Sequence, residues 1–239
     1  MCGRFTLTRK DFRMLVAELG IEGDLDEAYE QLYRPRYNIA PTDQHWIVRT
    51  KYERREMLPA KWGLINSWSK DAKGAARHIN AKSETAAKSP AFKEAFEKRR
   101  CVVPADGFFE WRGAKEARQP IWFHPPDDAL LLFAGLYESW REPQSGEWWR
   151  TFTILTTGAS DDVAAVHDRM PVILPPDRID EWMYPKAGER DVRGLLVPAP
   201  AGTLAGTPVS RRVNSVANDD ADCLQPANDA EPVESPRLL

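Results

Sequence analysis

The stretch CVVPADGFFEW, at residues 101–111, decides the class of fold. It is rich in the aromatic and β-branched residues that strands favour. Strand-like runs of the same kind recur on both sides of it, at residues 45–50, 55–65, 119–124, 129–140 and 147–157. The first two of these runs are expected to form a hairpin. The protein is therefore expected to consist mainly of β-sheet.

Helical patterns lie between these runs. Residues 8–20, TRKDFRMLVAELG, predict an amphipathic helix because their apolar side chains recur at helical spacing. Thr8 with Asp11 resembles a capping box at its start, and Gly20 suits its end. Shorter helices are expected within residues 77–100, 161–166 and 175–184, and prolines predict a loop at 34–42.

Strands and helices do not alternate regularly along the chain. This order argues against βαβ winding and favours a single α+β domain of largely antiparallel sheets. We place the domain at residues 1–226. Residues 227–239 are acidic and rich in proline, and we expect them to form a disordered tail.

The charge is unevenly distributed. The 239 residues have a net charge of −3, but residues 219–239 contain six acidic residues and one basic residue. The remainder is therefore weakly basic, which permits a local basic groove. No apolar run approaches the about 20 residues of a membrane span, and a secretory pattern is absent. We expect a cytoplasmic protein with no membrane partner. Three widely spaced cysteines indicate neither a disulfide framework nor a metal site.

Cys2 directly follows Met1, and removal of Met1 would leave an α-amine and a thiol on one residue. The amine, with an ordinary pKa of about 8, can condense with an aldehyde to an imine, and the thiol, at about 8.5, can then add to that imine. The product is a five-membered thiazolidine ring. The alternative is that Cys2 has no role, since short motifs often occur by chance.

Glu110 and His167 are candidates for proton transfer. In a strand, Phe108 and Glu110 share one face, so a carboxylate lies among large rings. Desolvation there would raise its pKa toward neutrality, whereas a glutamate on a solvated edge would have no such role. His167 follows a predicted helix and either shuttles protons or serves the structure.

Amides and cations complete the candidate residues. Asn38 and Asn80 lie in predicted loops, where asparagine serves turns or orients an amine or a sugar oxygen. Trp68 could supply a stacking surface beside cations that follow a phosphate backbone, namely Arg4, Arg77, Lys82 and Arg169. Each cation taken singly could instead be an exposed solubilising side chain.

The sequence resembles the SRAP (SOS response-associated peptidase) family. Its motifs occur in order along almost the whole domain, as MCGRF at 1–5, RYNIAP at 36–41, INAKSETAA at 79–87, CVVPADGFFEW at 101–111 and HDRMPVIL at 167–174. Several motifs in the same order are far more specific than any one of them.

The resemblance implies a single α+β domain with sheets around a DNA-binding groove. It also implies a sensor of abasic sites in single-stranded DNA that becomes covalently attached to them. Cys2 would be the crosslinking nucleophile, Asn80 would position its amine, Glu110 would move protons and His167 would assist opening of the sugar. Arg4 and Arg169 match phosphate-contacting positions. Met1 would leave by self-cleavage or through a housekeeping aminopeptidase.

We count Asn38, Trp68, Arg77 and Lys82 among the DNA-binding candidates, and we expect a monomer without cofactor or metal. Two departures from the family pattern affect this set. Lys82 stands where relatives often have arginine, so a bidentate phosphate contact is lost, and Trp68 stands alone where some relatives have paired tryptophans.

Two rival functions remain open. A cysteine peptidase acting in trans would use Cys2 and Glu110 on an acyl carbon, and a non-covalent module would bind single-stranded DNA without using Cys2. The same imine could also lead to abasic-site lyase activity, and we expect this competing reaction to be minor.

Overall fold

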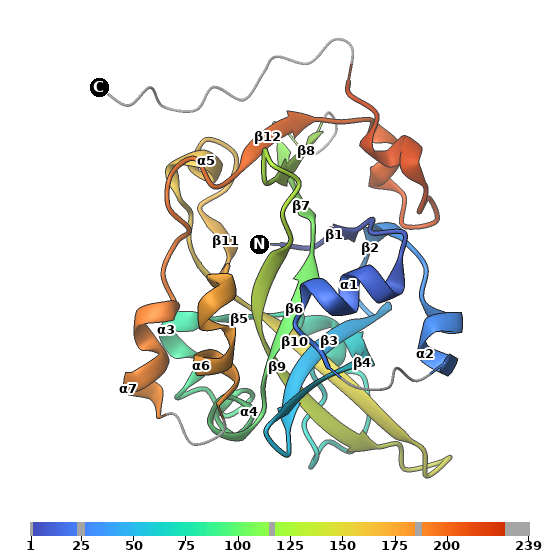
Figure 1. The fold of residues 1–239 in the computed structure, drawn as a ribbon, viewed down its shortest axis with the longest axis vertical. Helices are drawn as coiled ribbons and strands as arrows, with labels where there is room; N and C mark the ends of the chain where they lie inside the picture. The colour runs from blue at the N-terminus through green and yellow to red at the C-terminus, as the bar shows by residue number, and fades with distance from the viewer. Residues whose placement is uncertain (1, 23–26, 115–117, 185–187, 228–239) are drawn as a thin grey trace.

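The structure is a computed structural model that describes residues 2–22, 27–114, 118–184 and 188–227. The predicted α+β class is confirmed, with mostly strands and short helices (Figure 1). The strands are β1 (Phe5–Leu7), β2 (Arg36–Ile39), β3 (Gln44–Lys51), β4 (Arg54–Trp62), β5 (Asn80–Lys82), β6 (Arg100–Ala105), β7 (Gly107–Arg112), β8 (Gln119–His124), β9 (Leu131–Arg141), β10 (Trp148–Gly158), β11 (Arg169–Pro171) and β12 (Ala205–Pro208). The α-helices are α1 (Phe12–Glu18), α2 (Glu27–Leu32), α3 (Ser83–Ala86), α4 (Lys93–Lys98), α5 (Asp161–Ala164), α6 (Ile179–Met183) and α7 (Glu189–Val192).

The strands form two sheets. The first has the order β12-β8-β7-β1-β2, and the second has the order β11-β10-β4-β3-β6-β9. Because β9 also pairs with β10, five strands of the second sheet close into a ring. β5 pairs in parallel with residues 154–156 of β10, with Asn80 opposite Ile154. In Figure 1, α1 and α2 lie on one side of these sheets, and α3, α6 and α7 lie on the other.

An aromatic core joins the two sheets. The ring of Phe5, on β1, lies 4.7 Å from that of His45 and 5.0 Å from that of Trp62, and both of these residues belong to the second sheet. All three side chains are buried. Burial of aromatic surface of this size is the main favourable contribution to folding. The first residues of the chain are therefore anchored between the sheets.

The deciding stretch at 101–111 forms two strands in different sheets. Asp106 separates β6 from β7, and its carboxylate accepts hydrogen bonds from the hydroxyls of Thr6 (2.6 Å) and Thr8 (2.7 Å). The predicted alternation of β7 is confirmed, because Phe108 packs in the main core and Phe109 in a second cluster. The break at Asp106 moves the chain from one sheet to the other and keeps β1 beside β7.

Two local predictions were wrong. The proline-bounded segment 34–42 contains β2, which pairs with β1. The N-cap of α1 is Asp11, whose carboxylate accepts from the backbone N–H groups of Arg13 and Met14, while Thr8 is bound to Asp106 instead. The predicted role of Gly20 is confirmed by its φ of +62° directly after Leu19, the C-cap of α1.

The predicted disordered tail at 227–239 lies outside the described residues except for Ala227. None of the helices in the described part of the chain has the length and apolar composition that a membrane crossing requires.

Substitution of Gly107 by alanine tests the contact between β7 and β8. An added Cβ would lie 2.0 Å from Nε1 of Trp122, whose ring also stacks on His124. We expect Gly107→Ala to lower the free energy of unfolding by about 1–3 kcal/mol, as overpacked core sites do. Gly194→Ala is the matched control because nothing lies within 4 Å of its added Cβ. Denaturant unfolding of both variants measures the difference, and equal stabilities would contradict this account.

Candidate active site

The start of the chain lies between the two sheets. The carbonyl oxygen of Arg4 accepts a hydrogen bond from the backbone N–H of Phe109, on β7 (2.9 Å). On the other side, the side-chain Nδ2 of Asn80, on β5, donates to the carbonyl oxygen of Cys2 (2.7 Å). The backbone of Cys2 is thus held where a strand of the first sheet faces a strand of the second.

The Cys2 side chain is completely buried. Its Sγ lies 3.7 Å from the carbonyl oxygen of Arg4. Burial raises the pKa of the thiol well above its ordinary value, and the negative charge of Glu110 raises it further. A protonated thiol is a weak nucleophile, so the sulfur needs a nearby group that accepts its proton.

Glu110 lies on β7 and is 4% exposed, as its predicted position among aromatic rings implied. Desolvation raises the pKa of its carboxyl, and the charge of His167 lowers it in part. Glu110 therefore lies close enough to Cys2 to raise the pKa of its thiol, and close enough to His167 for the charge of that ring to lower the pKa of the Glu110 carboxyl. A carboxyl with a raised pKa near a nucleophile is typical of an acid or base in catalysis.

His167 lies between α5 and β11, where its backbone N–H donates to the carbonyl oxygen of Val163 (3.0 Å). Its Nδ1 accepts from the backbone N–H of Arg169 (2.9 Å) and lies 3.0 Å from a carboxylate oxygen of Asp168. In neutral His167 the hydrogen is therefore assigned to Nε2. When the ring is protonated, Asp168 can accept from Nδ1, so either charge state has a local partner.

Only one of the two polar side-chain atoms of Asn80 makes a hydrogen bond within the described part of the chain. Its Nδ2 donates to Cys2, while its Oδ1 is buried and accepts no hydrogen bond from any described residue. A buried acceptor without a partner is costly unless a ligand or a nearby donor uses it. An amine on Cys2 is such a donor, because the amide already holds that residue by its carbonyl.

Arg169 is held by protein partners rather than projecting freely. Its Nη2 donates to a carboxylate oxygen of Glu84 (2.9 Å) and to the carbonyl oxygen of Thr156 (2.6 Å), and its Nη1 contacts the other oxygen of Glu84. This ion pair lowers the pKa of the Glu84 carboxyl. Any phosphate that approaches Arg169 therefore competes with Glu84.

Arg4 and Asn38 bind one another. Nη1 of Arg4 donates to Oδ1 of Asn38 and to the carbonyl oxygen of Val213 (2.8 Å each). Asn38 is 1% exposed, and its Nδ2 donates to three carbonyl oxygens at 213–218. Its amide thus ties β2 to the C-terminal part of the domain and orients Arg4. We leave it out of the proposed DNA-contacting residues.

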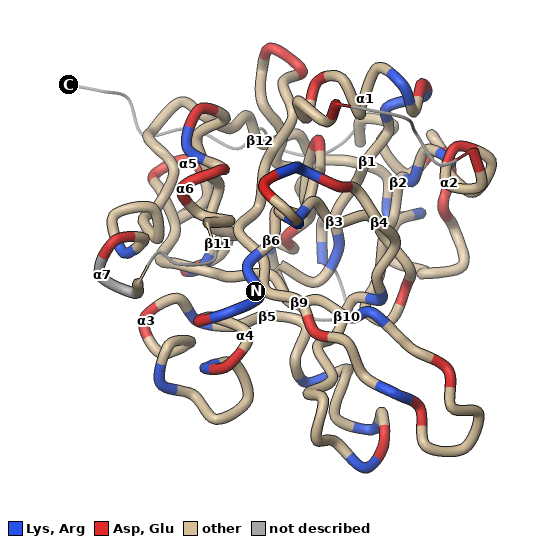
Figure 2. Tube along the Cα trace, turned by 60° about the horizontal axis from the view of Figure 1, so that its bottom comes forward, with Lys and Arg blue, Asp and Glu red and all other residues tan. Residues whose placement is uncertain are grey.

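The remaining candidates are exposed. Trp68 is 67% exposed, and the carbonyl oxygen of Ser69 beside it accepts a hydrogen bond from Nε1 of Trp140. Arg77 and Lys82 have exposed side chains on either side of Asn80 in sequence, and Lys82 is opposite Thr156 in the sheet. In Figure 2, basic segments lie near the start of the chain and beside β5. These positions are compatible with a cationic border around Cys2.

Sequence reasoning missed three neighbours of the site. Glu84 pairs with Arg169, Thr156 anchors the same guanidinium, and the ring of Trp111 lies 5.9 Å from the guanidinium carbon of Arg4. Glu84 stands directly after Lys82 and Ser83, but nothing in the sequence links it to an arginine 85 positions later. Trp111 follows Glu110, so the alternation of β7 could have indicated it.

No group of three or more histidine, cysteine, aspartate or glutamate side chains in the described ranges is arranged to hold a metal ion.

Comparison with known proteins identifies the family to which the chain belongs. The profile of the SOS response associated peptidase (SRAP) family matches residues 1–216. Two relatives are "Abasic site processing protein YoaM" of Bacillus subtilis, 36% identical over 95% of this chain and 99% of its own, and "Abasic site processing protein YedK" of Escherichia coli, 32% identical over 95% and 100%. A crystal structure of a protein from Bacteroides thetaiotaomicron superposes with a TM-score of 0.84 at 25% identity, covering 95% of this chain and 100% of that one.

By its fold, the protein is a single α+β domain with a buried cysteine near its N-terminus. The chain belongs to the SRAP family, and the resemblance seen in the motifs is confirmed.

Glu110→Gln tests the cost of burying the Glu110 carboxylate. Desolvation raises the pKa of the Glu110 carboxyl in the folded protein. The folded protein therefore has its full stability below the pKa that this carboxyl has in the unfolded chain, and its free energy of unfolding falls as the pH rises through the pKa of the folded state. We therefore expect the melting temperature of Glu110→Gln relative to the unsubstituted protein to increase from pH 4.5 to pH 8.5. Glu97→Gln, at an exposed site, is the control. A difference that does not change with pH would refute the assignment.

Proposed function

We propose that this protein recognises abasic sites in single-stranded DNA and shields them by forming a thiazolidine crosslink through Cys2. The observation that carries the proposal is the set of groups around Cys2. Asn80 donates to its carbonyl oxygen, the charge of Glu110 raises the pKa of its thiol, and the charge of His167 in turn lowers the pKa of the Glu110 carboxyl. The names of the relatives, which describe abasic site processing, support the choice of substrate.

The first step is removal of Met1 by hydrolysis of the peptide bond to Cys2, which exposes the α-amine. We infer that Asn80 orients this amine, since its Nδ2 fixes the adjoining carbonyl and its Oδ1 is a buried acceptor. The same geometry would support self-cleavage, with Glu110 as the group that moves the proton.

The second step unmasks the aldehyde of the damaged sugar. In the closed hemiacetal, the C1′ hydroxyl loses a proton while the ring oxygen gains one, so a base and an acid are needed together. Glu110 and His167 supply this pair. The Cys2 amine then attacks C1′, and loss of one water gives the imine.

The third step closes the ring. The Cys2 sulfur adds to C1′ of the imine, and the thiol proton is transferred to nitrogen, so the product is a neutral thiazolidine. Because burial keeps the thiol protonated, we expect the amine to react first and the sulfur second, with Glu110 relaying the proton. The closed ring contains no iminium to promote β-elimination, and the strand is protected from breakage.

A single-stranded substrate follows from the burial of Cys2, because the sugar must leave a base stack to reach it. Arg4, Arg77, Lys82 and Arg169 would contact phosphates, and the exposed Trp68 would stack on a base. We therefore expect little sequence preference and an affinity that falls with salt.

Substitution of Cys2 separates the crosslink from binding and from a simple imine. We expect Cys2→Ala to form no adduct with abasic single-stranded DNA that survives denaturing electrophoresis, while borohydride still traps its imine. Mass spectrometry of each purified variant first establishes whether Met1 is absent. Full adduct formation by Cys2→Ala without borohydride would exclude the thiazolidine and favour a covalent link through an amine.

Glu110→Gln should retain binding to intact single-stranded DNA and slow adduct formation by about 10²- to 10⁴-fold, the usual contribution of a general acid or base. Glu97→Gln is again the control. Rapid turnover of unrelated peptides by the unsubstituted protein, lost in Glu110→Gln, would instead support a peptidase acting in trans.

Glu84→Gln tests the competition for Arg169. An exposed ion pair contributes about 0.2–1 kcal/mol, so its loss should tighten binding of intact single-stranded DNA about 1.4- to 5-fold. Fluorescence anisotropy across a salt series measures this change, and the salt dependence should become steeper. Weaker binding would show that Glu84 holds Arg169 in its DNA-binding position.

A further inference from the structure

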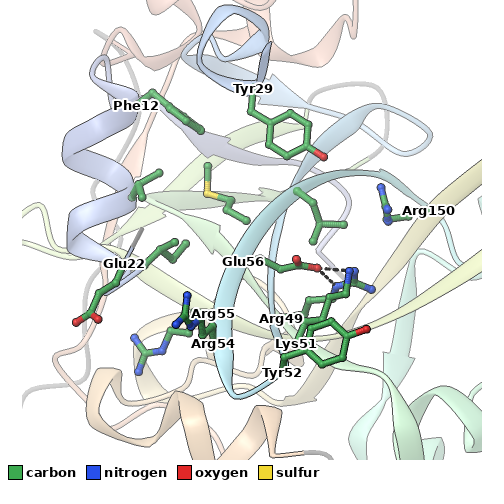
Figure 3. A pocket seen from close by; sticks show the side chains of 14 residues that line it. Phe12, Glu22, Tyr29, Arg49, Lys51, Tyr52, Arg54, Arg55, Glu56 and Arg150 are labelled. Carbon is green, nitrogen blue, oxygen red and sulfur yellow. Dashed lines mark hydrogen bonds and ion pairs between the residues drawn. The ribbon is translucent and has the colours of Figure 1, made fainter. Parts of the chain in front are cut away.

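A cavity lies away from Cys2. Its volume is about 780 Å³, and it is bordered by α1, α2 and the β3–β4 hairpin, with one residue from the start of β10 (Figure 3). Ligand pockets commonly have volumes of about 300–1,000 Å³. The residues that line it include none of those proposed for crosslinking or for DNA contact.

The lining is basic. It contains five lysine and arginine side chains but only two carboxylates. Three of the cations, Lys51, Arg54 and Arg150, are exposed and make no ion pair with any residue in the described ranges. The other two are already paired, Arg49 with Glu56 across the hairpin, as Figure 3 shows, and Arg55 with Asp180. Three positive charges are thus available to a bound anion.

The inner wall is apolar. Phe12 and Val16 from α1 face Met57 and Leu58 from β4, and Tyr29 from α2 lies beside them. The rings of Phe12 and Tyr29 lie 5.5 and 5.6 Å from that of Trp46, so packing fixes their positions. A fixed apolar wall next to separate cations matches a ligand with one bulky apolar group and several negative charges.

We propose that this cavity is a docking site for an acidic peptide segment of a partner protein, with an aromatic or aliphatic side chain inserted against Phe12 and Met57. Carboxylates spaced along a peptide can reach Lys51, Arg54 and Arg150 separately while avoiding Glu22 and Glu56 on the same border. A continuous phosphate backbone would meet those two carboxylates. This inference does not depend on the proposed DNA chemistry.

Peptide titration tests the site. The probe is a fluorescein-labelled octapeptide of four aspartates and three glycines that ends in phenylalanine. Its binding to the full chain is followed by anisotropy at low salt. We expect saturable binding that weakens at least five-fold in Arg54→Ala and in Arg150→Ala. Arg211→Ala removes an equally exposed cation outside the cavity and should leave the affinity unchanged.

Two further probes separate the contributions. Replacement of the terminal phenylalanine by glycine should weaken binding at least five-fold if the apolar wall is used, and replacement of the aspartates by asparagines should abolish it. Adduct formation with abasic DNA should be unchanged in Arg54→Ala and Arg150→Ala. Equal weakening by Arg211→Ala would overturn the proposal, as would loss of affinity for a thymidine 15-mer in Arg54→Ala and Arg150→Ala, which would assign the cavity to DNA.

Discussion

The hydrogen bond from the Asn80 side chain to the carbonyl oxygen of Cys2 is the constraint on which the site depends. It ties the first described residue of the chain to β5, while the backbone of Arg4 is bound to β7. A chain terminus normally moves freely, whereas residues 2–4 are held here by these two hydrogen bonds. In the proposed mechanism, these bonds hold the amine and thiol of Cys2 at one defined point near Glu110, so that the entropy of positioning is lost during folding rather than during the reaction.

Burial determines the order of the proposed chemistry. The same absence of water raises the pKa of the Cys2 thiol and of the Glu110 carboxyl, so both groups hold their protons more tightly than they would in solution. A buried thiol does not react indiscriminately with cellular electrophiles, and it becomes a nucleophile only when the proton can pass to a neighbour. The arrangement costs stability, as active sites commonly do. The cationic residues around it are restrained in a similar way, because Arg169 is paired with Glu84 and Arg4 with Asn38.

Much of this architecture could be predicted from the sequence, since the longer strands, β3, β4 and β6 to β10, contain many aromatic and β-branched residues and the alternation of β7 correctly placed Phe108 and Phe109 on opposite faces. The short strands β5, β11 and β12 have no such composition. The sheet to which each strand belongs could not be predicted. The break at Asp106 depends on hydrogen bonds to Thr6 and Thr8, about a hundred residues earlier in the chain. For the same reason Asn38 looked like a loop amide available to DNA, whereas it is buried against carbonyls more than 170 residues away. The grouping of Cys2, Asn80, Glu110 and His167 came from the family resemblance, and the individual residues alone did not indicate it.

The most direct measurement is mass spectrometry of the peptide that carries the DNA adduct after digestion with trypsin and nuclease, in the presence of a thiol-alkylating reagent. The account predicts a peptide of residues 2–4, with Met1 absent, that carries the sugar remnant with loss of one water and contains no alkylated sulfur. A peptide that retains Met1, or one whose Cys2 sulfur is alkylated while the sugar remains attached, would contradict it.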